Sequence, residues 1–314
     1  MSSTRGISLD KLIEGRSSGL CYEIIAQLNT TDLNMLLNNL GIERLNRKSF
    51  EICQRYEASG SCWTQTAYGI ILYYLLGKAN QKAAQRLSSI VPHSMLMREN
   101  DALYKIEALL IGASGLLDLY NDNFAIPLKQ EFEHLAIKYN ITPLHISDWQ
   151  LSGIHLNNHP TLRLAQLAAC IHHNSISISN LANCSNNRDV NALFKHSASD
   201  YWIDTLTRYS NERNIAARVG SIMSSIIAIN AVVPLLFTYS NYIESHAINE
   251  RSLDILHTLN AENNIIIRKW HSYKDIAHNA FESQALIQLS TEYCKRGRCK
   301  ECPLAKIVVD KNNP

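Results

Sequence analysis

Apolar residues recur at helical spacing along most of this chain, most clearly in residues 279–304. Four apolar residues there follow one another every four positions and define one face of a helix: Phe281, Ala285, Leu289 and Tyr293. Gln284 and Gln288 form a second row beside this face. Asn279, followed three residues later by Glu282, has the capping-box spacing of a helix start. The pattern predicts a helix that packs against a core.

Two further helices have clear start signals. The cluster Thr30–Asp32 has the residue types of an N-cap and predicts a helix from Leu33 to about Tyr56, with Gly41 as a point where it could break. Pro160 suits the first turn of another helix, because its missing N–H group has no partner there in any case.

The chain shows no sustained alternation of period two, no Asn-Gly hairpin and no Gly-rich phosphate loop. We therefore predict an all-α fold, a single multi-helix array of about ten helices with a C-terminal Cys-containing loop. Residues 1–314 are expected to form one helical domain, with a weak sub-boundary in the irregular stretch 141–158.

Residues 219–243 contain no charged residue and are long enough to span a bilayer. Several Ser and Asn residues interrupt the stretch, and Pro234 lies inside it. These features favour a buried central helix that is kinked at Pro234, with Asn230 needing a hydrogen-bond partner in the core. We expect no association with a membrane.

Composition sets further bounds. The chain has 314 residues, is 46% hydrophobic and carries a net charge of +2, so overall charge alone does not make it a polyanion binder. It has eight Cys, and the polar segment 1–16 lacks the apolar region of a signal peptide. Reduced thiols and a cytoplasmic location are expected.

The helix that begins near residue 280 leads into a C-x4-C-x2-C pattern: Cys294, Cys299 and Cys302. Three thiols in nine residues can converge on one soft metal ion, such as zinc, or on an iron–sulfur cluster. Both groups usually take four protein ligands, and residues 305–314 contain no further Cys. Either a fourth ligand comes from elsewhere, or one position is open, or the thiols hold no metal.

The loop around these cysteines is basic, with Glu301 as its acidic residue among four cations: Lys295, Arg296, Arg298 and Lys300. The cations could lower the pKa of the thiols, offset the charge of a cluster, contact a phosphate backbone, or form a solvated surface. Arg44 and Lys48, four residues apart on one predicted helix, and Arg163 on another are further candidates for phosphate contacts.

Other chemistry is weakly signalled. His155 and His159 have metal-ligand spacing only if their segment is helical, and Pro160 argues against that, so surface histidines are expected. No carboxylate pair suggests acid–base catalysis, and no Ser or Cys has the surroundings of a nucleophile elbow. The sequence assigns no catalytic residue.

Several segments carry a resemblance, and they keep their order along the chain: Cys21-Tyr22-x-Ile24-Ile25, Glu43-Arg44-Leu45-x-x-Lys48, Ile106–Leu109 with Gly112 and Gly115–Leu117, Pro160-Thr161-x-Arg163-x-Ala165–Ala168, Tyr201-Trp202, Ile229-Asn230-x-Val232-x-Pro234-x-x-Phe237-x-Tyr239, Ser283–Leu289, and Glu292–Cys294 with Cys299 and Cys302. Together they resemble the C-terminal part of a bacterial family known as domain of unknown function 2851. The resemblance covers nearly the whole chain.

The resemblance includes Cys21, and so implies a fourth ligand that would clamp the first helices to the last loop. Family members usually carry, ahead of this region, a β-rich domain with acidic motifs like those of PD-(D/E)xK nucleases. That domain and its carboxylates are not expected here. Gly153 and His155 stand where arginines are expected, and Tyr74 and Leu75 where an Arg-Asn pair is expected. These departures are typical of a truncated or degenerate member.

Three functions follow as hypotheses. The first is a nucleic-acid-processing accessory module in which a Cys-bound zinc ion or iron–sulfur cluster holds the two ends together. The second is a non-catalytic protein-interaction module, with or without metal, that docks on a partner such as a protein with a nuclease-like domain. The third, an enzyme in its own right, is the least supported, because no base, nucleophile or substrate pocket can be assigned.

Overall fold

The computed structural model describes residues 9–14, 19–208 and 215–310. Helices joined by turns and short loops make up most of these residues, and none of them forms a strand, which confirms the all-α prediction. Two extended residues, Asn260 and Asn279, pair in an isolated antiparallel bridge. Most of the polar segment 1–16 lies outside the described residues.

The chain divides into two compact units. Unit 1 contains residues 1–50 and 256–314, so it joins the two ends of the chain, and unit 2 contains residues 51–255. The division falls at positions 50/51 and 255/256, and the irregular stretch 141–158 lies inside unit 2.

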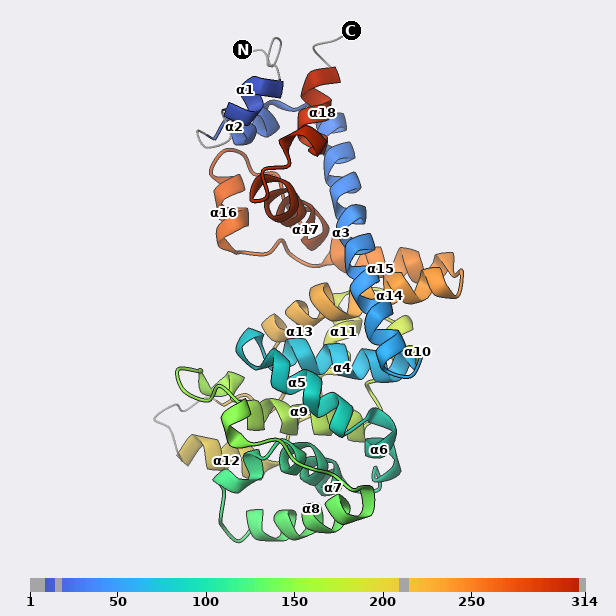
Figure 1. The fold of residues 1–314 in the computed structure, drawn as a ribbon, viewed down its shortest axis with the longest axis vertical. Coiled ribbons are helices and arrows are strands. Elements are labelled where there is room, and N and C mark those ends of the chain that lie inside the picture. The colour runs from blue at the N-terminus through green and yellow to red at the C-terminus, as the bar shows by residue number, and fades with distance from the viewer. Residues whose placement is uncertain (1–8, 15–18, 209–214, 311–314) are drawn as a thin grey trace. The chain divides into compact units, whose positions relative to one another are not determined.

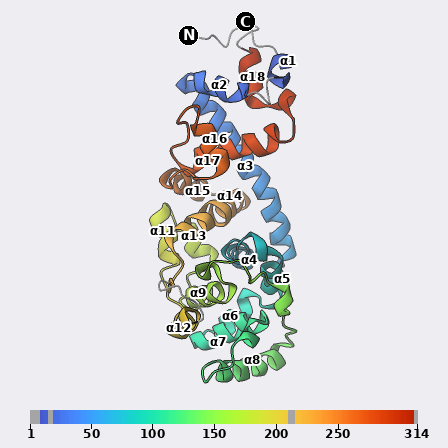
Figure 2. The ribbon, with the colours of Figure 1, turned by 90° about the vertical axis from the view of Figure 1, so that its left-hand side faces the viewer.

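Unit 1 is built from helices of both chain ends, which lie side by side in Figures 1 and 2. Its helices are α1 (Leu9–Glu14), α2 (Leu20–Gln27), most of α3 (Thr30–Ala58), α16 (Ile265–His271), α17 (Ala280–Gln288) and α18 (Pro303–Asp310). Two short segments complete it, the π-helical segment Leu289–Cys294 and the 3-10 turn Cys299–Glu301. The core joins Ile25 and Leu40 of the N-terminal part to Trp270 and Leu286 of the C-terminal part. Each end therefore supplies half of a hydrophobic core that neither half could bury alone.

Helix α3 runs unbroken through Gly41. Its cap is Asn29, one residue before the predicted cluster, whose side chain accepts from the N–H of Asp32 at 2.9 Å and donates to the Asp32 carboxylate. Gly41 does not break the helix; it makes room for a neighbouring side chain. A Cβ atom there would lie 2.4 Å from Cζ of Phe281, so the absence of a side chain lets the Phe281 ring lie against α3.

Helix α17 confirms the capping prediction, because the side chain of Asn279 accepts from the N–H of Glu282 at 3.0 Å. The carboxylate of Glu282 in turn accepts from the N–H of His278. The four apolar residues of the predicted face are all buried: Phe281, Ala285, Leu289 and Tyr293.

Unit 2 contains more and shorter helices than the sequence predicts. They are α4 (Trp63–Leu75), α5 (Gln81–Ile90), α6 (His93–Arg98), α7 (Leu103–Glu107), α8 (Ala125–Tyr139), α9 (Pro160–His172), α10 (Ile178–Ala182), α11 (Asn187–Leu193), α12 (Asp200–Arg208), α13 (Ser221–Ile227), α14 (Val233–Tyr242) and most of α15 (His246–Thr258). Between them lie 3-10 turns at Lys78–Asn80, Leu116–Leu119, Ile146–Asp148 and Leu156–Asn158, and π-helical turns at Ala108–Gly112 and Ala228–Val232.

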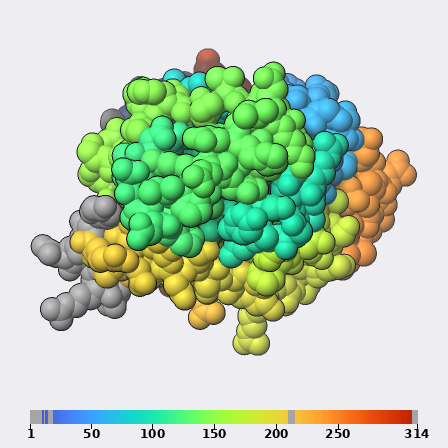
Figure 3. Space-filling view, turned by 90° about the horizontal axis from the view of Figure 1, so that it is seen from below, coloured from blue at the N-terminus to red at the C-terminus, as the bar shows by residue number. Residues whose placement is uncertain are grey.

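The central helix of unit 2 is α9, every residue of which from Pro160 to Ile171 is buried. Pro160 occupies its first turn, as predicted. In Figure 3, α8 and its neighbours, in green, form one face of unit 2 beside α12, in yellow. Burial on all sides explains why the sequence of α9 shows no polar stripe.

The uncharged stretch forms one helix, Ser221–Tyr242, in which α13, a π-helical turn and α14 follow without interruption. Of the described helices, this one is long and apolar enough to cross a membrane, but 67% of its most apolar window is buried inside the protein. The π-helical turn precedes Pro234, where a proline ring disrupts the regular hydrogen bonding. The side chain of Asn230 donates to the carbonyl of Ile226 at 3.0 Å.

Candidate metal centre

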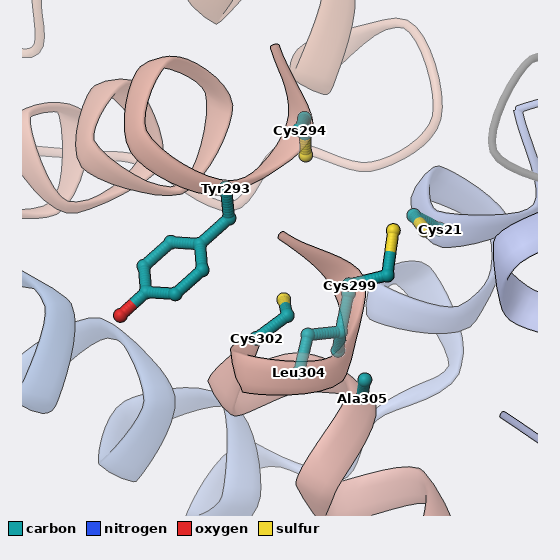
Figure 4. Close-up of a pocket in the computed structure, with 7 residues that line it drawn as sticks. All are labelled: Cys21, Tyr293, Cys294, Cys299, Cys302, Leu304 and Ala305. Atoms are coloured by element: carbon teal, nitrogen blue, oxygen red, sulfur yellow. The ribbon is translucent and has the colours of Figure 1, made fainter. Parts of the chain in front are cut away.

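Four cysteines from both ends of the chain line one pocket in unit 1 (Figure 4). Cys21 comes from α2, and Cys294, Cys299 and Cys302 come from the segment between α17 and α18. The other lining residues are Tyr293, Leu304 and Ala305. The pocket encloses about 360 Å³ free of protein atoms, part of which is open to solvent. The structure therefore brings the three thiols of the C-x4-C-x2-C pattern together with the fourth thiol that the family resemblance implies.

The backbone between the cysteines turns tightly enough to face them into one space. Cys294 ends the π-helical segment, and Gly297 then reverses the chain with a φ of 68°, a conformation that glycine adopts without strain. The N–H of Arg298 returns to the carbonyl of Tyr293 at 3.0 Å. Cys302 follows the 3-10 turn, and Pro303 begins α18 directly after it.

Cys302 is the most buried of the four thiols, with 8% of its surface exposed. Burial raises its pKa, while hydrogen bonds from the backbone N–H groups of Ala305 and Leu304 oppose that rise. These N–H groups belong to the first turn of α18, where unpaired donors stabilise a thiolate. Without a metal the thiol is protonated at neutral pH. The adjacent donors would also stabilise the thiolate form that a metal ligand requires.

The thiols line the pocket but do not surround a single point. Among the residues that the structure describes, no group of three or more His, Cys, Asp or Glu side chains is arranged to hold one metal ion. No disulfide joins any of the eight cysteines, all of which are described.

A polar layer connects this pocket to α3. The hydroxyl of Tyr293 lies 2.9 and 2.8 Å from the two carboxylate oxygens of Glu43, and Gln288 donates to the same carboxylate at 3.0 Å. Burial, and after it the Glu43 carboxylate, raises the pKa of Tyr293 to about 12. Tyr293 thus keeps its proton at neutral pH and acts as a hydrogen-bond donor on the wall of the pocket.

The same layer continues along α3 and α17. Arg44 donates to the side-chain oxygen of Gln284, whose amide donates to Glu262. Arg47 lies 3.4 Å from the amide oxygen of Gln288. The row of Gln284 and Gln288 on α17 therefore forms an internal contact to α3, and both side chains are buried together with the apolar face beside them.

A model of the protein family described as "Protein of unknown function (DUF2851)" matches residues 3–265. The chain belongs to this family. The matched range includes Cys21 and ends before the C-terminal Cys loop. No curated protein and no solved structure matches the chain.

In this DUF2851 chain, the six basic residues considered for nucleic-acid contact fall into two groups. Three of them are in or near the polar layers of the core. Lys48 is buried, Arg44 is half-buried against Gln284, and Arg163 is 5% exposed. Arg163 lies in unit 2, where it donates to Gln166 at 3.0 Å and to Asn158 at 2.8 Å. Its burial lowers the pKa of the guanidinium to about 10. These side chains are engaged in internal contacts, so a phosphate-binding surface is better sought elsewhere.

The other three basic residues, Lys295, Arg296 and Arg298, lie in the Cys loop itself, next to Lys300. Lys295 and Arg296 are exposed, as is Lys300, while Arg298 is half-buried. Arg296 pairs with Glu292 at 3.0 Å, and Arg298 pairs with Glu301 while its guanidinium lies 5.3 Å from the centre of the Tyr293 ring. The loop keeps an excess of positive charge over these two carboxylates.

The histidines of the irregular stretch have a local structural role that the sequence analysis missed. The side chains of His145, His155 and His159 each accept a backbone N–H two residues ahead, from Ser147, Asn157 and Thr161 respectively. They cap the two 3-10 turns and α9 in the way that Ser or Asn usually does. Each histidine directly precedes a helical turn, which is the position where a capping side chain is expected.

Proposed function

We propose that this DUF2851 chain is a helical accessory module in nucleic-acid processing, in which a metal centre on Cys21, Cys294, Cys299 and Cys302 joins the two ends of the chain. The observation that carries the proposal is the convergence of these four thiols on one pocket from α2 and from the loop before α18. Cys21 is separated from the other three by the whole of unit 2 in sequence.

The donor set suits a thiophilic metal group. Four cysteine thiolates are the usual ligands of a [4Fe–4S] cluster and of many structural zinc sites. We propose an iron–sulfur cluster as the occupant, with zinc as the alternative.

The metal centre would act as a structural clamp. When bound, it would offset part of the thiolates' negative charge and link α2 to the C-terminal loop, so its binding free energy would add to the stability of unit 1. Residues around the thiols suit such a centre. Tyr293, Leu304 and Ala305 line the pocket, and α18 presents backbone donors to Cys302.

Nucleic acid would bind at the basic loop that carries three of the cysteines. The exposed side chains of Lys295, Arg296 and Lys300 give the loop the charge that phosphate contacts require. As an accessory module, the chain would work with a protein partner that supplies the catalytic residues. Reduced thiols at the centre fit a cytoplasmic location.

Nucleic-acid binding can be tested by fluorescence anisotropy with labelled single-stranded and duplex DNA at several salt concentrations. We expect the logarithm of the association constant to fall linearly with the logarithm of salt concentration, with a slope of about 0.9 for each phosphate contacted. The double variant Lys295→Gln/Lys300→Gln should lower that slope by about 2. The matched control Arg188→Gln/Lys195→Gln removes two exposed cations of unit 2 and should leave the slope unchanged.

A flat salt dependence, or equal slopes for the two double variants, would overturn the nucleic-acid part of the proposal. A non-catalytic protein-interaction module would then be the better description, because it does not depend on phosphate contacts. The metal centre is tested separately, by measuring the metal content of the purified protein.

A further inference from the structure

Unit 2 contains a groove between the C-terminal end of α3 and helices α4 and α5. It encloses about 730 Å³ free of protein atoms, part of which is open to solvent. All of its lining residues lie between Arg55 and Pro92, so the groove belongs to unit 2 alone.

The groove carries one cation and no carboxylate. Arg55 is its one lining residue with a permanent charge, and the rest are hydroxyl, amide or apolar residues. The Arg55 guanidinium lies 4.5 Å from the centre of the Tyr73 ring, which orients it without neutralising its charge. A ligand that matches this wall carries a negative charge.

The hydroxyl groups of the groove present oxygen lone pairs more than protons. Ser59 has the carbonyl of Tyr56 as an acceptor at 2.8 Å, and Ser88 has that of Gln85 at 2.8 Å. Thr66 has the carbonyl of Cys62 at 2.9 Å. Oγ of Ser59 and Oγ1 of Thr66 also lie 2.8 Å apart, so one of these two hydroxyls donates to the other or both turn to their carbonyls. In each case the hydroxyl protons have partners within the protein, and the oxygens keep lone pairs that can accept a further hydrogen bond.

The amide of Gln65 makes one donor and one acceptor bond within the protein. Its nitrogen donates to the carbonyl of Ser88 at 2.9 Å, and its oxygen accepts from the N–H of His93 at 2.6 Å. This pair of bonds fixes α4 to the end of α5. It makes Gln65 part of a rigid wall and commits one of its two amide N–H groups to the protein.

We propose that this groove binds a small organic anion that carries several hydroxyl groups. Its anionic group would contact Arg55, and its hydroxyl protons would be donated to the oxygens of Ser59, Thr66 and Ser88. Phosphorylated sugars and sugar acids share this chemistry. A simple anion would leave the acceptor oxygens unused, and a neutral sugar would leave Arg55 without a counter-charge.

Gly69 provides a way to block the groove. It lies on α4, and a Cβ atom built there would meet Oγ of Ser88 at 3.5 Å, an ordinary contact distance. Its φ is not in the left-handed region, so a larger residue fits the helix without backbone strain. In Gly69→Leu the added side chain would occupy the groove itself.

Isothermal titration calorimetry on the full chain tests the proposal with four probes: ribose 5-phosphate, gluconate, ribose and inorganic phosphate. We expect ribose 5-phosphate or gluconate to bind at least about tenfold more tightly than ribose and inorganic phosphate, a free-energy difference of about 1.4 kcal/mol. Binding of ribose 5-phosphate alone would assign a phosphorylated sugar, and binding of gluconate alone a sugar acid.

Three variants place the binding in the groove. Arg55→Gln should weaken it at least tenfold, Gly69→Leu should abolish it, and the control Lys82→Gln, an exposed residue of α5 outside the groove, should leave it unchanged. Circular dichroism confirms that each variant is folded. The proposal is overturned if neither anion binds, if ribose or inorganic phosphate binds equally well, or if folded Arg55→Gln and Gly69→Leu retain wild-type affinity.

Discussion

The hydroxyl group of Tyr293 lies within 3 Å of both carboxylate oxygens of Glu43, at 2.9 and 2.8 Å. Tyr293 immediately precedes Cys294 and lines the Cys pocket, whereas Glu43 lies in the middle of α3. This bond therefore fixes the wall of the proposed metal centre to the longest helix of unit 1. It also brings a charged group close to the thiols without placing it among their potential ligands.

Removing that hydroxyl should destabilise unit 1. In Tyr293→Phe, the Glu43 carboxylate loses a buried donor and keeps Gln288, so we expect the free energy of unfolding to fall by about 1.5–3 kcal/mol. Urea unfolding followed by circular dichroism measures the change. Tyr242→Phe is a matched control, because its exposed hydroxyl lies 3.5 Å from that of Tyr56 and should contribute little. Equal losses in both variants would contradict the role assigned to Tyr293.

Gly41→Ala tests the contact between α3 and α17. Alanine favours an isolated helix over glycine by about 1 kcal/mol, but its Cβ atom would lie 2.4 Å from Cζ of Phe281. We expect a net loss of about 1–3 kcal/mol in the free energy of unfolding from overpacking. The second variant Phe281→Leu, combined with Gly41→Ala, should recover part of that loss by making room. A Gly41→Ala protein more stable than wild type would show that the ring moves aside at no cost.

Glu107 predicts a pH dependence of the stability of unit 2. It is fully buried on α7, where Ser199 donates to one carboxylate oxygen at 2.6 Å, and burial raises its pKa above the usual 4.5. The folded state therefore binds a proton more tightly than the unfolded state does. The stability that this proton supplies is complete below about pH 4.5 and is lost as the pH rises through the folded pKa.

Glu107→Gln should remove this dependence. The free energy of unfolding, measured by urea titration between pH 4.5 and pH 8, should decline less with rising pH in the variant than in wild type. Glu57→Gln, at an exposed position of α3, should follow the wild-type curve. Parallel curves for wild type and Glu107→Gln would contradict the assignment.

Arg163 should affect stability and leave nucleic-acid binding unchanged. Arg163→Ala removes the hydrogen bonds to Gln166 and Asn158 and leaves a space in the buried helix α9, so we expect a loss of about 2–4 kcal/mol in the free energy of unfolding. Anisotropy measurements under conditions where the variant stays folded should give the wild-type affinity for DNA. A large loss of affinity in the folded variant would return Arg163 to the binding surface.

Local signals in the sequence predicted local structure well. Asn279 caps α17 as its spacing with Glu282 suggested, and Pro160 opens α9. The apolar spacing in α17 identified a buried face because a helix that packs on a core must keep that period. These features depend on residues within one or two turns of each other.

Long-range features were harder to predict. The division into two units depends on how the C-terminal helices return to α2 and α3, and no local spacing encodes that return. Arg163 and Lys48 were predicted to contact phosphates at the surface, but both are buried. Their burial comes from neighbours that are distant in sequence, which local spacing does not reveal. The C-x4-C-x2-C pattern located three thiols. The family resemblance was needed to suggest Cys21, because a single cysteine in α2 forms no motif with another cysteine nearby in the sequence.

The central claim is a metal centre on four cysteines, and the most direct test is the metal and acid-labile sulfide content of protein purified without oxygen. We predict iron and sulfide with broad visible absorbance in wild type, their loss in Cys21→Ala, and their retention in Cys53→Ala, which removes an exposed cysteine of unit 2. If the protein instead contains zinc that is lost in Cys21→Ala, the metal centre joins the two chain ends as proposed, but its occupant is zinc and not an iron–sulfur cluster. Wild-type protein without bound metal, or a Cys21→Ala variant with wild-type metal content, would contradict the claim.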